Sequence, residues 1–197
     1  MKYDISALGN ALVDTQYMVD YEFLESIGLE ADSMTLASAE EQAPIIKKLI
    51  DMGSESVSDC GGSATNSLIA ASNYGSKCHH VCRVSDDADG KKYLESLRSA
   101  GVDHIGVSSK ESDMPTGKCL ILVTPDAKRT MSSMLGVSAF LAKSDIRFDV
   151  IDDSKICYIE GYMVTSEENF GAVISVLEHL EDKNTLKALS LSDAGIV

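Results

Sequence analysis

The sequence has 197 residues, of which 44% are hydrophobic and 24% are charged. This composition is ordinary for a globular protein with one sizeable core, so it argues against a disordered chain. The formal net charge of −14, from 31 acidic and 17 basic residues, argues against a nucleic-acid or anionic-membrane surface, because either partner would be repelled.

The cellular location is inferred from the N-terminus and the cysteines. No stretch approaches the roughly eighteen apolar residues of a membrane-spanning helix, and the N-terminus lacks the apolar run of a secretory signal. The cysteines are odd in number and scattered, which predicts reduced thiols rather than disulfides. We therefore expect a cytoplasmic protein with five free cysteines: Cys60, Cys78, Cys82, Cys119 and Cys157.

Seven strands are predicted from short apolar or alternating runs bounded by turn residues. In chain order they cover residues 3–8, 33–36, 80–84, 118–124, 129–135, 156–160 and 186–191.

Three amphipathic helices are predicted between these strands, because apolar residues recur there at 3.6-residue spacing. Their boundary signals are an S-x-x-E capping box at Ser38 and Glu41 with a terminal Gly53, a stop at Gly101 for the helix from Asp89, and a second capping box at Thr165 and Glu168.

Strands separated by helices predict an α/β fold with a mainly parallel sheet covered on both faces. Residues 11–37 and 104–135 interrupt this alternation, and the second stretch contains a hairpin with a four-residue turn at 125–128. We expect residues 1–197 to form one domain in which these two stretches build a small β lid over an edge of the main sheet. Two edge hairpins without function are the alternative.

The C-terminal region leaves the predicted sheet uncovered. Residues 186–191 resemble a core strand, and the sequence reaches Val197 without a helix to cover it. A parallel sheet exposed on one side would leave a large apolar patch, which soluble monomers rarely tolerate. We therefore expect the chain to be incomplete or to have a partner.

Two polar loops lie where a ligand would bind in such a sheet, beyond the carboxyl ends of the strands. Residues 9–14 follow the first strand, and residues 61–66 precede a helix whose N-terminal amides could meet a polar ligand. Asn10, Asp14 and Asn66 would add donors and acceptors suited to the hydroxyls of a sugar. A plain turn at 61–62 is the alternative.

Three other kinds of site find little support. The G-x-G-x-x-G fingerprint of dinucleotide binding and the P-loop motif are both absent. Cys78 and Cys82, with two histidines between them, could suggest zinc, but no second ligand pair follows at zinc-site spacing. A buried strand is the better interpretation of this segment, so no metal site is predicted.

Several motifs occur together in one order: ALGNALVD at 7–14, CGGSATNS at 60–67, AGVD at 100–103, PTGKCLILVTPDAKRTM at 115–131, CYIEGYMVT at 157–165 and ALSLSD at 188–193. With them the chain resembles the N-terminal part of a PfkB or ribokinase-family kinase, closest to the adenosine-kinase-like branch. The resemblance covers nearly the whole chain and implies a ribokinase-like fold.

The resemblance also implies an acceptor-binding site. Asp14 matches the family aspartate that holds sugar hydroxyls, with Asn10 beside it. The glycine-rich site that holds the same sugar is matched by Gly62, Ser63 and Asn66.

Four further residues take roles from the same resemblance. Cys119 and Leu135 fall on lid strands that close over the base or the outer sugar face. Tyr162 is placed to stack on a purine, although a tyrosine after a buried strand is more often part of the core. Arg129 matches a lid arginine that approaches the transferring phosphate, although an arginine in a hairpin is more often solvated.

The family reaction transfers the ATP γ-phosphoryl group to a sugar hydroxyl, with Mg²⁺ neutralising charge. The family's GAGD segment with its catalytic aspartate and its N-x-x-E motif do not occur in this sequence. ATP and Mg²⁺ are therefore expected for the complete enzyme but not for this chain alone, and no catalytic or metal residue is assigned.

Two functional hypotheses follow. The chain is the acceptor-binding and lid portion of an ATP-dependent sugar or nucleoside kinase, inactive alone; or it is a non-catalytic sugar or nucleoside-binding module or truncated pseudo-kinase. Tyr162 and the apolar lid favour a nucleoside, but the particular substrate is open. A homodimer through the lid or through the incomplete sheet is a further hypothesis.

Overall fold

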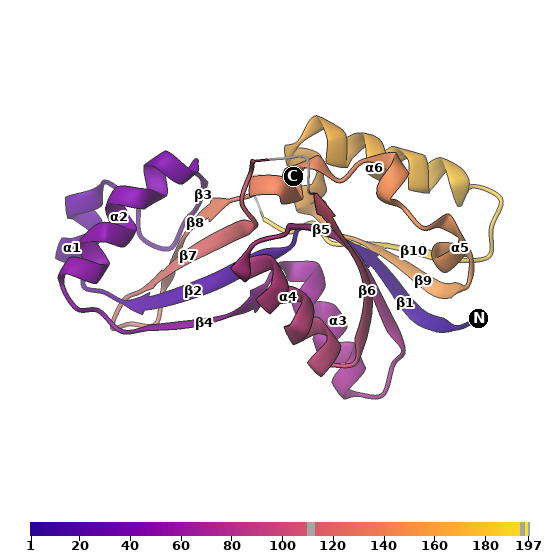
Figure 1. The fold of residues 1–197 in the computed structure, drawn as a ribbon, viewed down its shortest axis with the longest axis horizontal. Coiled ribbons are helices and arrows are strands. Elements are labelled where there is room, and N and C mark those ends of the chain that lie inside the picture. The colour runs from indigo at the N-terminus through magenta and orange to yellow at the C-terminus, as the bar shows by residue number, and fades with distance from the viewer. Residues whose placement is uncertain (110–112, 194–195, 197) are drawn as a thin grey trace.

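The computed structural model describes residues 1–109, 113–193 and 196, and these form two five-stranded sheets (Figure 1). All neighbouring strands of the main sheet are parallel. Its strands, in spatial order, are β10 (Leu186–Leu189), β9 (Ser154–Ile159), β1 (Tyr3–Leu8), β5 (Cys78–Ser85) and β6 (Val102–Ser109).

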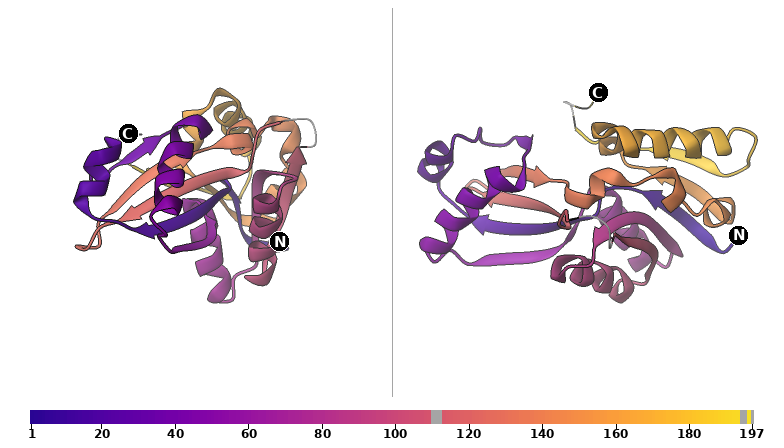
Figure 2. Two further views of the ribbon diagram at one scale, coloured as in Figure 1. Left: turned by 60° about the vertical axis from the view of Figure 1, so that its left-hand side comes forward. Right: turned by 45° about the horizontal axis from the view of Figure 1, so that its top comes forward.

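Helices cover both faces of the main sheet. One face carries α3 (Ser63–Asn73) and α4 (Ala88–Ser99), and the other carries α5 (Phe148–Asp152) and α6 (Glu167–His179) (Figures 1 and 2). This arrangement confirms the predicted α/β fold with a mainly parallel sheet.

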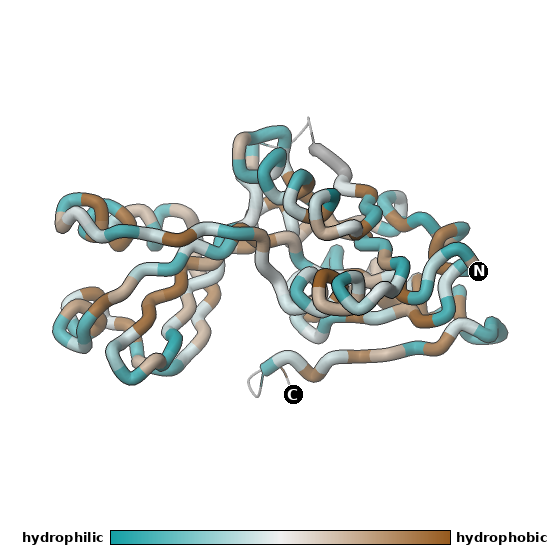
Figure 3. The backbone as a smooth tube through the Cα atoms, turned by 90° about the horizontal axis from the view of Figure 1, so that it is seen from below, coloured by the Kyte–Doolittle hydropathy of each residue, from teal (hydrophilic) through white to brown (hydrophobic). Residues whose placement is uncertain are grey.

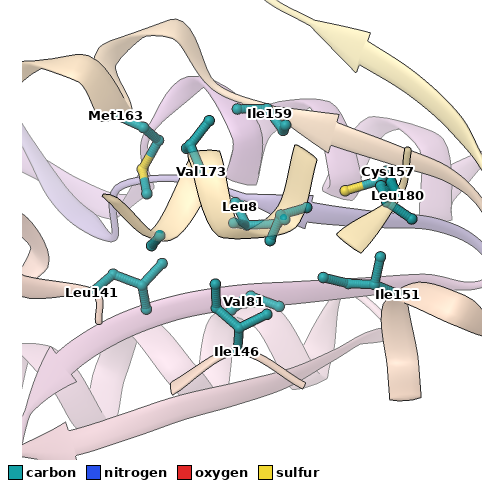
Figure 4. Close-up of a cluster of buried hydrophobic side chains, with 12 residues drawn as sticks. Leu8, Val81, Leu141, Ile146, Ile151, Cys157, Ile159, Met163, Val173 and Leu180 are labelled. Atoms are coloured by element: carbon teal, nitrogen blue, oxygen red, sulfur yellow. The ribbon is translucent and has the colours of Figure 1, made fainter. Parts of the chain in front are cut away.

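Two cores lie on opposite sides of this sheet because successive side chains of a strand point to opposite faces. On β1, Leu8 packs with α5 and α6, whereas Ala7 packs with α3 and α4. On β5, Val81 packs in the core with Leu8, and Cys82 packs in the core with Ala7. Figure 4 shows the first core, in which Leu8 and Val81 meet side chains of α5 and α6.

The second sheet lies beyond one end of the main sheet (Figures 1 and 2). In spatial order it contains β3 (Met34–Leu36), β8 (Arg129–Met134), β7 (Gly117–Val123), β2 (Leu12–Met18) and β4 (Ser56–Gly61). Two helices, α1 (Tyr21–Ile27) and α2 (Ala39–Asp51), bury their apolar residues against it.

The second sheet differs in extent from the lid expected at 11–37 and 104–135. Its edge strand β4 comes from outside both ranges and pairs antiparallel with β2, while β6 pairs parallel with β5 in the main sheet. Residues 110–112 of the expected lid lie outside the described residues. The sequence S-V-S-D-C-G of β4 lacks the alternation of apolar and polar residues that marks a half-buried strand. This strand is mostly exposed, so its sequence carries no signal for it.

All seven predicted strands are present with small shifts in their ends, whereas β2, β4 and β6 and the short helices α1 and α5 were not predicted. The hairpin of β7 and β8 is confirmed, with the Ala127 amide donating to the Thr124 carbonyl at 2.8 Å in its turn.

One predicted capping box is confirmed and the other is wrong. The Ser38 hydroxyl accepts from the Glu41 amide at 3.2 Å, and the Glu41 carboxylate accepts from the Ser38 amide at 2.7 Å. At α6 the cap is Ser166, which accepts from the Asn169 amide at 3.2 Å. Thr165 instead ends the preceding 3₁₀ turn, Gly161–Thr165, where its hydroxyl donates to the Tyr162 carbonyl.

The β10 strand forms one edge of the main sheet and is largely exposed. Leu186 and Leu189 are 65% and 63% exposed. In Figure 3 the segment that leads to the C-terminus carries apolar residues along the outside of the molecule. The need for a covering segment or partner stays a prediction.

Candidate functional site

A pocket of about 240 Å³ lies between the second sheet and the carboxyl ends of β1 and β9. All nine residues singled out from the sequence line it: Asn10, Asp14, Gly62, Ser63, Asn66, Cys119, Arg129, Leu135 and Tyr162. They come from segments far apart in the chain, so the fold assembles one site from them. Their contacts with a ligand stay predictions.

Asp14 provides an acidic group on β2. Its register neighbours are Asp59 on β4 and Cys119 on β7. Burial raises the pKa of Asp14 to about 6, the positive charge of Arg129 opposes this shift, and the Asp59 carboxylate adds to it. The Asp14 carboxylate is therefore poorly compensated by the protein, so hydroxyl donors of a ligand would stabilise its charged form.

The glycine pair before α3 lets other protein groups approach its backbone closely. A Cβ atom at Gly61 would lie 2.1 Å from the carboxyl carbon of Asp14. Gly62 has φ +98°, and a Cβ atom there would lie 2.4 Å from the Asn10 carbonyl oxygen. The two glycines thus let the loop after β1 and the start of α3 pack at one place.

A network of buried polar side chains holds the start of α3 in place. The Thr65 hydroxyl lies 2.5 Å from the Tyr93 hydroxyl and 3.1 Å from the His80 Nε2 atom. All three side chains are fully buried. This network joins α3, α4 and β5 and fixes the helix turn that carries Ser63 and Asn66.

Glu160 is a site residue that sequence analysis missed. It directly follows β9, is 2% exposed, and lines the pocket. Its Oε2 atom accepts from the Ala64 amide at 3.2 Å and the Asn10 amide at 3.3 Å. Burial raises its pKa to about 7, and these two amides oppose the shift. An acidic residue directly after an apolar strand, as in Y-I-E, was the available signal.

The raised pKa of Glu160 predicts a pH-dependent stability. Between pH 4.5 and about 7 the folded protein binds more protons at Glu160 than the unfolded chain does, so the contribution of Glu160 to the free energy of unfolding falls as pH rises through this range. A pKa shift of this size corresponds to a contribution of about 3 kcal/mol to the free energy of unfolding, and this contribution is lost by pH 8. The lowered pKa values of His79 and His80 act in the opposite direction, so the contribution of Glu160 is isolated by comparison with a variant at this position.

Urea unfolding at pH 5 and pH 8 measures this effect. Glu160→Gln keeps an oxygen acceptor for the two amides but cannot ionise, so the variant should gain stability relative to the wild type at pH 8. An equal dependence on pH in both proteins would contradict the assignment.

The apolar part of the pocket lining comes mainly from the second sheet, which also carries Asp14. Cys119 is buried there, the Ser133 hydroxyl donates to its sulfur at 3.4 Å, and burial raises the pKa of its thiol to about 11. The thiol is therefore protonated and acts as an apolar group. Other apolar members of this lining are Leu12, Met34, Leu36, Met131 and Leu135.

Tyr162 and Arg129 lie at the rim. Tyr162 is half-buried in a short 3₁₀ turn, Gly161–Thr165, and burial raises its pKa. Arg129 is exposed at the start of β8 and close enough to Asp14 to influence its pKa. An aromatic ring and one positive charge thus flank a pocket that has a polar and an apolar lining.

The segment with paired cysteines and histidines is a buried strand. Cys78, His79, His80 and Cys82 are each at most 3% exposed on β5. Across the part of the chain that the structure describes, no group of three or more His, Cys, Asp or Glu side chains could hold a metal ion. The described residues therefore provide no set of ligands that fits Mg²⁺, and no step is derived through that ion here.

The fold and pocket define an α/β protein with a cavity at the carboxyl ends of parallel strands. The chain belongs to the PfkB family of carbohydrate kinases, because the pfkB family carbohydrate kinase model matches residues 24–194.

Similar proteins support this membership. The chain is 25% identical to an adenosine kinase of Saccharomyces cerevisiae over 199 residues, covering 98% of this chain and 57% of that protein. It is 29% identical to a ribokinase of Mus musculus over 106 residues, covering 51% of this chain and 32% of that protein.

A solved structure shows the same fold. The adenosine kinase from Sinorhizobium meliloti superposes with a TM-score of 0.87 and 28% identity, covering all of this chain and 59% of that one. The ribokinase-like fold is thereby confirmed, and the chain spans less than two thirds of the length of these relatives. Within the described residues, no helix is both long and apolar enough to cross a membrane.

Proposed function

We propose that this chain holds the acceptor substrate of an ATP-dependent phosphotransferase, and that the acceptor is a nucleoside or a furanose sugar. The observation that carries the proposal is a pocket that combines a polar and an apolar lining. The polar lining contains the half-buried carboxyl group of Asp14 and the buried one of Glu160, with Asn10 and Asn66. The apolar lining comes mainly from the second sheet, on which Asp14 also lies.

The polar lining suits adjacent sugar hydroxyls, because each hydroxyl both donates and accepts a hydrogen bond. Carboxylates take the donated hydrogens and carboxamides return hydrogen bonds to the oxygens. In phosphoryl transfer, catalysis depends mainly on positioning and electrostatic stabilisation. The role proposed for these residues is therefore to fix the hydroxyl that receives the phosphoryl group.

The apolar lining favours a nucleoside over a free sugar. A planar base presents two apolar faces, and sulfur-containing side chains such as Met34, Met131 and Cys119 adapt well to aromatic rings. Tyr162 at the rim could stack on the base. The adenosine kinase relatives are consistent with this choice, whereas the ribokinase relative is consistent with a sugar.

Several other features belong to the same proposal. The second sheet would act as a lid over the acceptor within a single domain of residues 1–197, and Arg129 would approach the transferred phosphate from it. Membership of a kinase family implies use of ATP, and Mg²⁺ would accompany it in the complete enzyme. The five free cysteines are consistent with a cytoplasmic location, and dimerisation stays a prediction.

Calorimetric titration with adenosine, ribose and fructose, without ATP, tests the proposal. Adenosine should bind most tightly, because only adenosine has both a sugar for the polar side chains and a base for the apolar side chains of the pocket. A preference for ribose or fructose would assign the site to a sugar, and no binding of any of the three would contradict the proposal.

An assay of ATP-dependent phosphorylation separates the two functional hypotheses. The 197-residue chain should bind its acceptor but show no turnover. Turnover by this chain alone would contradict its inactivity. Turnover by a C-terminally extended chain would support the kinase hypothesis, whereas acceptor binding without turnover by that extended chain would favour the non-catalytic module.

A further inference from the structure

The side-chain amide of Asn10 is held in one orientation by groups outside the pocket. Asn10 follows β1, is 1% exposed and lines the pocket. Its Oδ1 atom accepts two hydrogen bonds, from the Asn169 Nδ2 atom at 3.1 Å and from the Ser138 hydroxyl at 3.2 Å. An asparagine amide can be turned by half a rotation with little change in shape, so its partners decide which end faces the ligand.

Backbone groups fix the amide of Asn169, which is fully buried on α6. Its Oδ1 atom accepts from the Leu141 amide at 2.9 Å, and its Nδ2 atom donates to the Ser138 carbonyl at 3.1 Å. An amide N–H can only donate and a carbonyl can only accept. Asn169 therefore cannot turn over, and its second Nδ2 hydrogen is directed to Asn10.

The hydroxyl of Ser138 assists in this orientation. It accepts from the Ala11 amide at 2.8 Å and donates its own hydrogen to the Oδ1 atom of Asn10. Two donors therefore meet at one end of the Asn10 amide. If this amide were turned over, its NH₂ group would face the Asn169 NH₂ group, which can only donate, and that hydrogen bond would be lost.

The opposite end of the Asn10 amide lacks a hydrogen bond. Its Nδ2 atom is buried without a hydrogen-bond partner among the described residues, and so is the hydroxyl of Ser63 in the same pocket. The Glu160 carboxylate lies close to both groups, because hydrogen bonding by the Asn10 and Ser63 side chains lowers its pKa, although neither atom has a direct hydrogen-bond partner among the described residues. Buried polar groups are nearly always hydrogen-bonded, because an unpaired buried donor is destabilising. An unsatisfied donor at a pocket wall thus points to a ligand atom that accepts.

We propose that Asn169, assisted by Ser138, is a positioning residue that keeps the NH₂ group of Asn10 available to the pocket, so that the site demands a hydroxyl oxygen as acceptor from its ligand. This inference rests on the function proposed above and deepens it, because it assigns a role to a residue 159 positions away from Asn10. It also predicts that selectivity for that hydroxyl depends on α6.

The test compares adenosine with 2′-deoxyadenosine and 3′-deoxyadenosine by NMR titration. In the wild type, one of the two deoxy analogues should bind at least tenfold more weakly than adenosine. In Asn169→Asp the new carboxylate has no hydrogen for Asn10, so the Asn10 amide should turn over and donate to that carboxylate instead of the ligand. The affinity ratio for that analogue should then fall below threefold.

Two other variants distinguish a change in ligand selectivity from a loss of folding. Ser138→Ala removes only one of the two donors, so it should lower the ratio partly. Ser154→Ala is the matched control: it removes a buried hydroxyl that donates to the Val150 carbonyl at 2.7 Å, at the far end of β9. This control should lose stability but keep the wild-type ratio, since a merely structural effect does not change which hydroxyl is preferred.

A spectroscopic readout without ligand separates this inference from the proposed function. The Asn10 side-chain ¹⁵N–¹H₂ signals should shift and become protected from solvent exchange in Asn169→Asp, because the NH₂ group would then be bonded inside the protein. Unchanged Asn10 signals, an unchanged ratio in Asn169→Asp, or no wild-type preference for either hydroxyl would overturn the inference. Failure of the wild type to bind adenosine, ribose or fructose would overturn the proposed function instead, and the Asn10 signals would still decide the role of Asn169.

Discussion

Replacing Asp14 by alanine is expected to weaken adenosine binding about a hundredfold. The carboxylate would accept hydrogen bonds from ligand hydroxyls at a site where burial raises its own pKa to about 6. Hydrogen bonds to charged groups contribute about 1.5–3 kcal/mol each, and about 2.7 kcal/mol corresponds to a hundredfold change in the dissociation constant. Calorimetric titration at pH 8, where Asp14 is ionised, measures the loss.

The chain offers a matched control for Asp14 on the adjacent strand. Asp59 is its register neighbour on β4 but is exposed. Asp59→Ala removes the same charge and should change adenosine affinity less than threefold. Asp14→Asn keeps the shape of the side chain and should fall between the two. Similar losses in Asp14→Ala and Asp59→Ala would show that general electrostatics, rather than a contact of Asp14, controls binding.

Replacing Gly62 by alanine is expected to lower the free energy of unfolding by about 2–4 kcal/mol. Part of this loss comes from a positive φ, which is costly for any residue with a Cβ atom. The rest comes from the methyl group, which would lie 2.4 Å from the Asn10 carbonyl oxygen and force the two loops apart. Urea unfolding measures the loss, and adenosine binding should weaken with it because Asn10 moves.

Gly75 separates the two contributions. Its φ is +90°, close to that of Gly62, but an added Cβ atom would meet no described atom within 4 Å. Gly75→Ala should therefore lose only about 1 kcal/mol, from backbone strain alone. If both variants lost the same free energy of unfolding, the close contact between Gly62 and Asn10 would not contribute to stability.

Much of the main sheet was predictable because its elements are encoded locally. The strands of the two cores are short apolar runs. Outside the main sheet, the start of α2 was predictable for the same reason, because the capping box of Ser38 and Glu41 lies within four adjacent positions. In contrast, β4 and β6 were missed. An exposed edge strand such as β4 is defined by its partner β2 rather than by its own sequence.

The sequence by itself determined the fold class and the two polar loops, because periodicity and loop residues after strands are local signals, and its resemblance to a kinase family indicated nine residues that line the pocket. Only the tertiary structure revealed the buried carboxyl of Glu160 and the contact of Asn169 with Asn10. It also showed that the backbone of Gly61 and Gly62 lies against Asp14 and Asn10. The physical reason is that pKa shifts, hydrogen-bond orientation and close contacts depend on atoms that lie far apart in the chain, and these meet only when the sheets assemble.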